Sequence, residues 1–353
     1  MTTHSLRDKA RGCLVGAAVG DAFGMPLEFS QPRPLATLVR EMTKGRLPAG
    51  TFTDDTQMMI ALAQSLLHHI PLDTTDLALR FLAWYRTNPP DIGLHTRLVL
   101  ERLATEDGWQ TASDMFKQIE ARADRRTALQ WLGSVDPENV RWPVAAAAVQ
   151  AQNPDSAGNG SLMRCFPVAL VYHDDMDACI KCSSVQGHVT HPHGECTAAD
   201  AFVSFTIVLL LKGTEPALAV QQALDYFSGR GTGMTIPLEQ AIRQAHGRTR
   251  EELPNTGWVR HTVESSIWAL LNTDSFRDAI VQVVNLGGDA DTAGAVTGAL
   301  AGAAYGLEAI PGEWQVMLQG RGPSPGDPVW RAPDFIALAD QLLVLPVSQK
   351  ESS

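Results

Sequence analysis

Apolar residues recur at steps of three and four along most of this chain, the spacing that puts them on one face of an α-helix. Met59, Leu62, Leu66 and Ile70 follow it and predict a helix that ends before Pro71. The same spacing predicts helices over roughly 74–85, 96–104, 196–211, 217–227, 259–271, 276–286 and 335–343. The alternating pattern of a strand is almost absent. We therefore predict an all-α fold of many short helices joined by short polar loops.

The chain gives no sign of a domain boundary. Long linkers, low-complexity tracts and shifts in composition are missing. A Pro- and Gly-rich stretch from Gly320 to Pro328 predicts a surface loop before the last helix. We therefore expect a single domain over residues 1–353, with its core at about 5–345.

Composition and charge narrow the function classes. Hydrophobic residues make up 44% and charged residues 19%, as in a globular protein with a substantial core. The net charge of −11 argues against nucleic-acid binding, because phosphate contact needs basic patches. The longest apolar run, Phe202 to Leu211, is too short to span a bilayer. The first residues lack the apolar stretch of a secretory signal, so we expect a cytoplasmic protein with no membrane partner.

The five cysteines agree with that compartment. Cys179 and Cys182 form a lone C-x-x-C with no second pair, which favours two cysteines on one helical face over a redox or zinc site. Cys13, Cys165 and Cys196 are expected to fill small spaces in the core.

Two segments carry glycine at every fourth position, which are Gly12, Gly16, Gly20 and Gly24, and Gly294, Gly298, Gly302 and Gly306. Each glycine destabilises a helix interior by up to about 1 kcal/mol relative to alanine. Residues four apart share a helix face, so each segment presents a nearly bare ridge. Such spacing also occurs in membrane helix dimers, but the acidic residues at the segment ends favour buried helices. We expect each ridge to face another helix backbone, and the two ridges are candidates to face each other.

Neighbouring acidic residues mark two predicted helix starts. Asp54 and Asp55 open the first, and Asp289 and Asp291 precede a helix expected from about Thr292. One carboxylate can cap a helix start, whereas four carboxylates at two starts call for a positive charge. Oxygen ligands without cysteine suit hard divalent ions such as Mg²⁺, Mn²⁺ or Ca²⁺. A metal site is favoured over two independent caps, which stay open as the alternative.

Six motifs together resemble the ADP-ribosylglycohydrolases, a family that includes the dinitrogenase reductase-activating glycohydrolase. They are "GCLVGAAVGDAFGMPLEF", "TDDTQM", "PPDIGLHTR", "GNGSLMR", "THPHGECTAA" and "NLGGDADTAGAVTGALAGAAYG". They follow the family's order and extend from Gly12 to about Trp314, so the resemblance covers most of the chain. One departure is Ala293, where many members have a second threonine.

The resemblance implies an all-α fold around a cleft with two Mg²⁺ or Mn²⁺ ions as cofactors. The family's metal-ligand positions fall on Thr53, Asp54, Asp55, Asp289, Asp291 and Thr292. Glu28 is implied beside the ions, directly or through water.

The family hydrolyses the N- or O-glycosidic bond between ADP-ribose and a modified side chain, commonly arginine. The implied partners are therefore an ADP-ribosylated protein or an ADP-ribosyl small molecule. Two metals can orient the ribose hydroxyls and activate a water, while a carboxylate accepts a proton; Asp54, Asp55 and Glu28 are the implied catalytic carboxylates with Asp91. Asp91 matches a family aspartate near the reacting ribose. From the residues alone it equally suits a helix N-cap after Pro89.

Three further motifs have both a substrate and a structural interpretation. The resemblance assigns an ADP-ribose contact surface to Gly158, Asn159, Gly160, Ser161 and Met163, whereas the pattern alone suits an ordinary capped turn.

Two ring side chains are also assigned to the substrate by the resemblance. His191 is implied on the substrate side, with a structural histidine as the alternative; the spacing of His188, His191 and His193 fits no common zinc pattern. Trp258 stands where relatives often have a tyrosine bordering the cleft, and a core tryptophan is the alternative.

Two other function classes compete with the hydrolase. One is an immunity-type binding protein that blocks an ADP-ribosyltransferase toxin by contact, which would need none of the metal motifs. The other is a metal-dependent phosphohydrolase, which shares the carboxylates but not the other five motifs. The six motifs favour the ADP-ribosyl hydrolase.

Overall fold

The computed structural model describes residues 5–105, 142–228 and 233–346. Their helices are α1 (Leu6–Gly24), α2 (Asp54–His68), α3 (Thr74–Tyr85), α4 (Leu94–Thr105), α7 (Trp142–Gln152), α8 (Phe166–Val171), α9 (Met176–His188), α10 (Gly194–Leu211), α11 (Pro216–Phe227), α12 (Ile236–Ala245), α13 (Val259–Leu271), α14 (Phe276–Val284), α15 (Ala290–Tyr305), α16 (Gly312–Met317) and α17 (Ala332–Leu343). Short 3-10 turns are η1 (Met25–Leu27), η2 (Leu35–Thr37), η4 (Leu162–Arg164), η5 (Arg250–Glu252) and η6 (Leu307–Ala309). The all-α prediction is confirmed.

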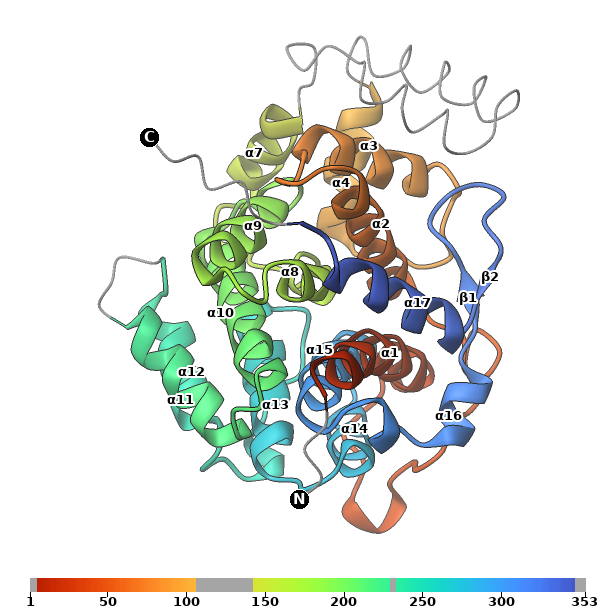
Figure 1. The fold of residues 1–353 in the computed structure, drawn as a ribbon, viewed down its shortest axis with the longest axis vertical. Coiled ribbons are helices and arrows are strands. Elements are labelled where there is room, and N and C mark those ends of the chain that lie inside the picture. Colours follow the sequence, from red (N-terminus) through yellow and green to blue (C-terminus); the bar gives the residue numbers. More distant parts are fainter. Residues whose placement is uncertain (1–4, 106–141, 229–232, 347–353) are drawn as a thin grey trace.

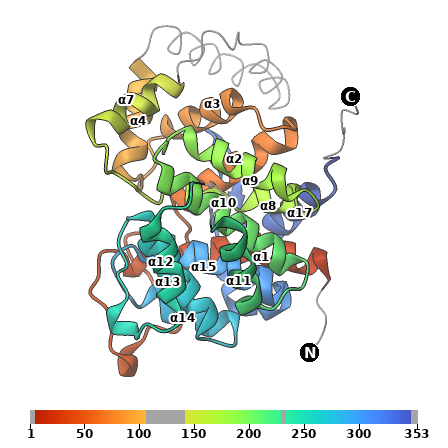
Figure 2. The same ribbon diagram turned by 90° about the vertical axis from the view of Figure 1, so that its left-hand side faces the viewer.

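Helices α1 and α15 lie side by side in the middle of the molecule (Figure 1, Figure 2). Helices α3, α4 and α7 form one end, and α14 lies at the opposite end in both views. The first and nearly the last long helix of the chain are therefore its central pair.

The two glycine ridges face each other, as one of the expected arrangements had it. A Cβ built on Gly16 would come within 2.3 Å of the Gly298 carbonyl oxygen, and one on Gly20 within 1.9 Å of the Gly294 carbonyl. Gly24 is as close to the carbonyl of Ala290, at 2.2 Å. No side chain fits in these gaps, so the two backbones are in direct contact along the ridge. The ridge prediction is confirmed.

Helix α10 has the length and apolar composition of a membrane span, yet 83% of it is buried inside the protein. Among the described residues it is the one helix with both properties. Its position in the folded chain is that of a core helix.

Several boundaries differ from the expected ones. Helix α2 ends at His68 and α14 at Val284, each two residues early. Helix α15 begins at Ala290, so Asp291 lies inside its first turn. The predicted surface loop is closed by a small antiparallel ladder of β1 (Gly320–Arg321) and β2 (Val329–Trp330), which the sequence pattern did not show.

The cysteines are buried and free in the described residues. Cys179 and Cys182 lie on α9, and burial raises the pKa of the Cys182 thiol to about 12. Such thiols are weak nucleophiles and poor metal ligands at neutral pH. The interpretation as two core cysteines on one helix is confirmed.

Candidate metal centre

The start of α2 is organised from below by Asp21, a fully buried residue of α1. Its carboxylate accepts the backbone N–H and the hydroxyl of Thr53, at 2.9 and 2.7 Å. It also accepts the N–H and hydroxyl of Thr56, at 3.1 and 2.5 Å. These bonds fix the first turn of α2, where Asp54 and Asp55 are buried. Asp21 was missed by the sequence analysis.

The start of α15 follows a turn that only glycine fits. Gly287 and Gly288 have φ values of 67° and 59°, and a Cβ on Gly288 would lie 1.8 Å from the Asn255 carbonyl oxygen. The turn delivers Asp289 to the position before α15, where the side-chain amide of Asn159 donates to its carboxylate at 2.8 Å. Asn159, which is distant in sequence, thus holds the Asp289 carboxylate in place.

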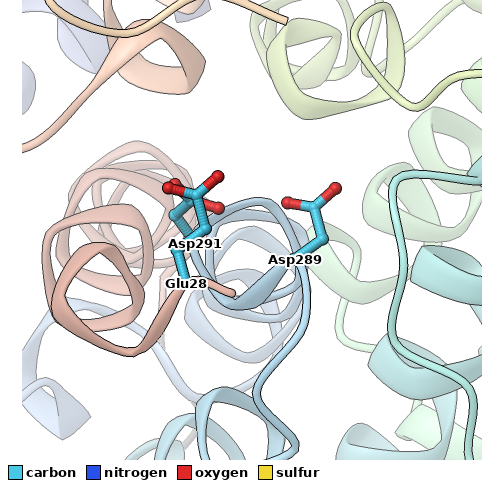
Figure 3. Close-up of side chains that lie close together, drawn as sticks. All are labelled: Glu28, Asp289 and Asp291. Atoms are coloured by element: carbon cyan, nitrogen blue, oxygen red, sulfur yellow. The ribbon is translucent and has the colours of Figure 1, made fainter. Parts of the chain in front are cut away.

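Glu28 is tied to this turn through its two following residues. The Phe29 N–H donates to the Gly288 carbonyl at 2.6 Å, and the Gly288 N–H donates to the Ser30 carbonyl at 2.9 Å. Glu28 and Asp291 consequently lie together, with Asp289 facing them (Figure 3). One carboxylate oxygen from each of the three falls within 4.8 Å of the other two.

Burial and mutual repulsion raise the pKa values of the central carboxylates. Burial raises the pKa of Asp54 to about 7, with Asp21 and Glu28 nearby adding to the effect. Burial, then Asp21, Asp54 and Asp289, raise the pKa of Asp55 well above its ordinary value, while a hydrogen bond with the Thr292 side chain opposes the shift. The interaction of Thr292 with Asp55 shows that the two half-sites meet.

The donor set fits a divalent cation better than two helix caps. Neither Thr53 nor Asp289, which stand at the two cap positions, accepts a hydrogen bond from its own helix through its side chain. The residues at these two cap positions therefore do not cap their helices, although the Asp291 carboxylate accepts the Thr292 N–H at 2.9 Å within the first turn of α15. A buried oxygen of Asp55 has no hydrogen-bond partner, although buried polar atoms are normally paired. Carboxylate and hydroxyl oxygens are the ligands that hard divalent ions take.

Asp91 lies at the rim of this cluster and caps no helix. Helix α4 begins at Leu94, and the Arg97 N–H donates to the Gly93 carbonyl, so Gly93 precedes the helix. The N-cap interpretation of Asp91 is therefore wrong. Its carboxylate instead forms an ion pair with Arg46, whose guanidinium also bonds Glu28.

The predicted ADP-ribose loop passes beside the metal centre. The Asn159 N–H donates to the Gly257 carbonyl at 3.1 Å, and Gly158 pairs with Trp258, so the loop runs along the segment that precedes α13. A Cβ on Gly160 would lie 2.7 Å from the His191 ring. Among the described residues, no acceptor is seen for the N–H groups of Gly160 and Ser161, and both residues are buried.

A buried polar network supports the underside of this loop. The Ser161 hydroxyl donates to Asp200 at 3.1 Å, and burial raises the pKa of Asp200 to about 8. Arg164 donates to Gln186 at 2.9 Å and lies over the Phe81 ring. Met163, predicted for the contact surface, is 4% exposed and belongs to the core beneath the loop.

His191 has a structural setting directly under the loop. It is buried, hydrogen-bonds the Thr190 hydroxyl at 2.8 Å, and its ring lies 4.6 Å from that of His95. Burial, with the charges of His95 and Arg164 nearby, lowers the pKa of His191 well below its ordinary value, so it is neutral.

The neighbouring histidines are used separately. His188 bonds the carbonyl of Ser184, and His193 caps α10 by accepting the Glu195 N–H. The histidines of this motif therefore have separate hydrogen-bond partners, in keeping with a spacing that fits no zinc site.

Trp258 is partly buried at the edge of the core. Its indole N–H donates to Glu195 at 3.2 Å, and the Arg260 guanidinium lies 4.6 Å from the ring centroid. Trp258 packs against the core cluster, in keeping with the core alternative, and its contact with substrate stays a prediction.

Comparisons with known proteins agree with this arrangement. A family model described as ADP-ribosylglycohydrolase matches residues 2–351. The ADP-ribosylarginine hydrolase Tri1 of Serratia proteamaculans is 31% identical, over 87% of this chain and 74% of its own length. The ADP-ribosyl-(dinitrogen reductase) glycohydrolase of Rhodospirillum rubrum is 30% identical, over 90% of this chain and 92% of its own. A solved "ADP-ribosylglycohydrolase-related protein complex" has a TM-score of 0.71 and 30% identity, covering 96% of this chain and 98% of that chain. The chain described here belongs to the ADP-ribosylglycohydrolase family.

Proposed function

We propose that this protein hydrolyses the glycosidic bond between ADP-ribose and an arginine side chain of a modified protein, using two Mg²⁺ or Mn²⁺ ions. The observation that carries the proposal is the convergence of Glu28, Asp289 and Asp291 on one point beside the start of α2. Relatives that are named for arginine and for dinitrogen reductase as substrates support the bond and the acceptor.

The metal ligands proposed for this chain are Thr53, Asp54, Asp55, Asp289, Asp291 and Thr292, with Glu28 beside them. Divalent ions held there would orient the ribose hydroxyls and lower the pKa of a bound water. Asp21 supports this function from outside the ligand set. Because its carboxylate accepts the hydroxyl protons of Thr53 and Thr56, the lone pairs of Thr53 are free to point toward a cation.

Asp91 is the residue proposed to handle the proton. In the reaction, water adds its oxygen to the anomeric carbon of the ribose, the carbon–nitrogen bond to the guanidine breaks, and the guanidine nitrogen takes up a proton. A carboxylate at the cleft rim can accept a proton from the attacking water. The Asp91 side chain is 22% exposed and reaches the ligand Glu28 through the shared Arg46, so it borders both the cluster and the solvent.

The loop from Gly158 to Ser161 is proposed to hold the diphosphate, because a glycine-rich loop can bind an anion through its backbone N–H groups and because Asn159 of this loop bonds the metal-centre residue Asp289. A cavity of about 520 Å³ adjoins this loop; its lining includes Leu94, His95 and Ser156. That volume suits a nucleoside-sized group. We assign the cavity to the adenosine part of the substrate.

The experiment is hydrolysis of ADP-ribosylated arginine by the full-length protein, before and after removal of metal with EDTA. Release of ADP-ribose should vanish with EDTA and return with Mg²⁺ or Mn²⁺. Undiminished release by metal-free protein would overturn the metal-dependent proposal. Release of AMP in place of ADP-ribose would identify a phosphohydrolase instead.

A blocking role against a toxin transferase can be separated from hydrolysis. Protection by blocking would persist in variants that lack the metal ligands, because physical contact with the toxin does not depend on catalysis. We propose that the Asp54→Ala variant fails to protect cells that express such a transferase, and protection by this variant would assign the blocking role.

A further inference from the structure

The metal centre contains a cation that belongs to the chain itself. The Arg46 guanidinium forms ion pairs with Glu28 through one terminal nitrogen and with Asp91 through the other. The second nitrogen also lies 3.6 Å from the carboxylate of Asp291. Arg46 therefore contacts two of the three residues that converge on the candidate cation position.

Arg46 is the single basic side chain, among the described residues, that forms ion pairs with Glu28, Asp91 or Asp291. Asp54 and Asp55 add further carboxyl groups to this crowded cluster, and the repulsion among them helps to raise their pKa values. Without a divalent ion, such a cluster gains from one cation that can reach several carboxylates. The planar guanidinium, with donors on separate nitrogens, suits this bridging role.

A divalent ion and this guanidinium compete for the same carboxylates. Metal ligation uses carboxylate lone pairs at about 2.0–2.6 Å, and Arg46 engages one oxygen of Glu28, Oε2. The two cations also repel each other at such short range. We therefore expect metal binding at Glu28 and Asp291 to displace the guanidinium.

The loop that carries Arg46 allows the side chain to leave without moving its backbone. A Cβ on Gly45 would lie 2.6 Å from Pro26, and one on Gly50 2.2 Å from the Met317 carbonyl, so the backbone is held on both sides of Arg46. The Arg46 side chain itself is 34% exposed. It can therefore turn into solvent while the loop stays in place.

We propose that Arg46 is a built-in counter-ion that competes with the divalent metal: it bridges Glu28, Asp91 and Asp291 in the metal-free protein, and it releases all three when the metal binds. Arg46 thereby sets the metal affinity of the site and keeps Asp91 engaged until metal is present. This inference rests on the proposed function, because it concerns the same ligands.

The test is metal affinity in the absence of substrate, measured by calorimetric titration of metal-free, full-length protein with MgCl₂ and with MnCl₂. Arg46→Gln should bind both metals at least about tenfold more tightly than the wild type, and the rise in Tm on adding metal should grow. Arg277→Gln is the matched control, because Arg277 also bridges two carboxylates, Glu41 and Glu313, on the surface. Its metal affinity should stay within about twofold of the wild type.

Competition between free guanidinium and the metal provides a second measurement, on a different variant. In Arg46→Ala, guanidinium chloride at low millimolar concentration should weaken metal binding more than NaCl of equal ionic strength, because free guanidinium can occupy the vacated position. Arg46→Lys, which keeps the charge but not the bridge, should have an affinity between those of the wild type and Arg46→Gln.

The outcomes distinguish this inference from the proposed function. Unchanged or weaker metal binding by Arg46→Gln, or no difference between guanidinium and NaCl in Arg46→Ala, overturns the counter-ion role and leaves the hydrolase proposal intact. A wild-type protein that binds neither metal overturns both.

Discussion

The starts of α3 and α15 use the same residue at the same position for different purposes. Asp73, before α3, accepts the N–H groups of Thr75 and Asp76 and so caps its helix. Asp289, before α15, accepts no bond from its own helix and instead bonds Asn159. A cap contributes about 1 kcal/mol to stability, and α15 forgoes it. The comparison shows that Asp289 is directed toward the metal centre and not toward its own helix.

The difference extends to the next acidic residue of each helix. In α3, Asp76 pairs with Arg80 of the following turn at 2.6 Å. In α15, Asp291 is buried, and its neighbours Asp55, Asp289 and Glu28 raise its pKa further after burial itself. At the start of α3, the carboxylate of Asp76 is paired with an arginine of the same helix. At the start of α15, several carboxyl groups lie close together, and they are a set that a cation would stabilise.

The largest effect should come from removing the carboxylate of Asp289. We expect Asp289→Ala to lower kcat/KM on the order of 10³-fold or more, because a proposed metal ligand is lost. Its metal-free Tm should be unchanged or higher, since repulsion among the remaining carboxylates falls. Steady-state kinetics and thermal unfolding in EDTA test both parts. Near-wild-type turnover would remove Asp289 from the site.

The metal-free protein should lose stability as pH rises from about 5 to about 7.5. Burial raises the pKa of Asp21 to about 6 and that of Asp54 to about 7, from 3.8. The folded state then binds more protons than the unfolded state in this window, so the free energy of unfolding falls as these groups ionise. The free energy of unfolding should therefore be on the order of 2–4 kcal/mol higher at about pH 5 than at about pH 7.5.

Urea unfolding of chelator-treated protein at several pH values measures this slope. Asp54→Asn should flatten it, because the titrating group is gone, whereas Asp73→Asn should not. Asp340, whose pKa is lowered by Arg7 and Arg11, titrates below this window and does not obscure the result. A stability that rises with pH in the wild type would contradict the expected charge accumulation.

Displacing the start of α15 should have an intermediate effect. A Cβ on Gly24 would lie 2.2 Å from the Ala290 carbonyl oxygen and 2.5 Å from the Asp291 Cα. Gly24→Ala should therefore lower the free energy of unfolding by roughly 1–3 kcal/mol and weaken metal binding. Gly194→Ala is the control, because a Cβ there meets nothing within 4 Å at the start of α10. Equal stability and metal affinity of the two variants would show that the close contact is unimportant.

The smallest effect should come from the ordinary cap. Asp73→Ala should lower stability by about 1 kcal/mol and leave kcat/KM unchanged, since the Asp73 carboxylate hydrogen-bonds the start of its own helix. Chemical denaturation and the hydrolysis assay measure the two quantities. A loss of activity without a loss of stability would show that Asp73 contributes to hydrolysis and is not simply a helix cap.

The sequence was sufficient for features that depend on local spacing. Helical periodicity predicted the fold, and glycine at every fourth residue predicted that each ridge faces another helix backbone, because one helix face is set by nearby residues alone. The paired acids at two helix starts predicted the half-sites. These features need no knowledge of the partner segment.

Other parts of the site depend on partners distant in sequence, which periodicity does not identify. Nothing in the pattern around Arg46 indicates that it reaches Asp91. The reciprocal bonds that tie Phe29 and Ser30 to Gly288 are likewise invisible in the sequence. Asp21 did leave a signal, as a lone acid in an apolar, glycine-rich helix. A buried charge needs donors, and Thr53 supplies two of them.

The pairing of the two ridges also has a consequence during protein synthesis. Helix α1 leaves the ribosome before its partner α15, which begins more than 250 residues after α1 ends. At about 5–20 residues per second, the interval is roughly 15 to 60 s. Throughout it, the glycine face of α1 lacks the one surface that fits it. The central helix pair can therefore form only after α15 has been made, and the nascent chain depends during that interval on contacts elsewhere, or on chaperones, to avoid aggregation.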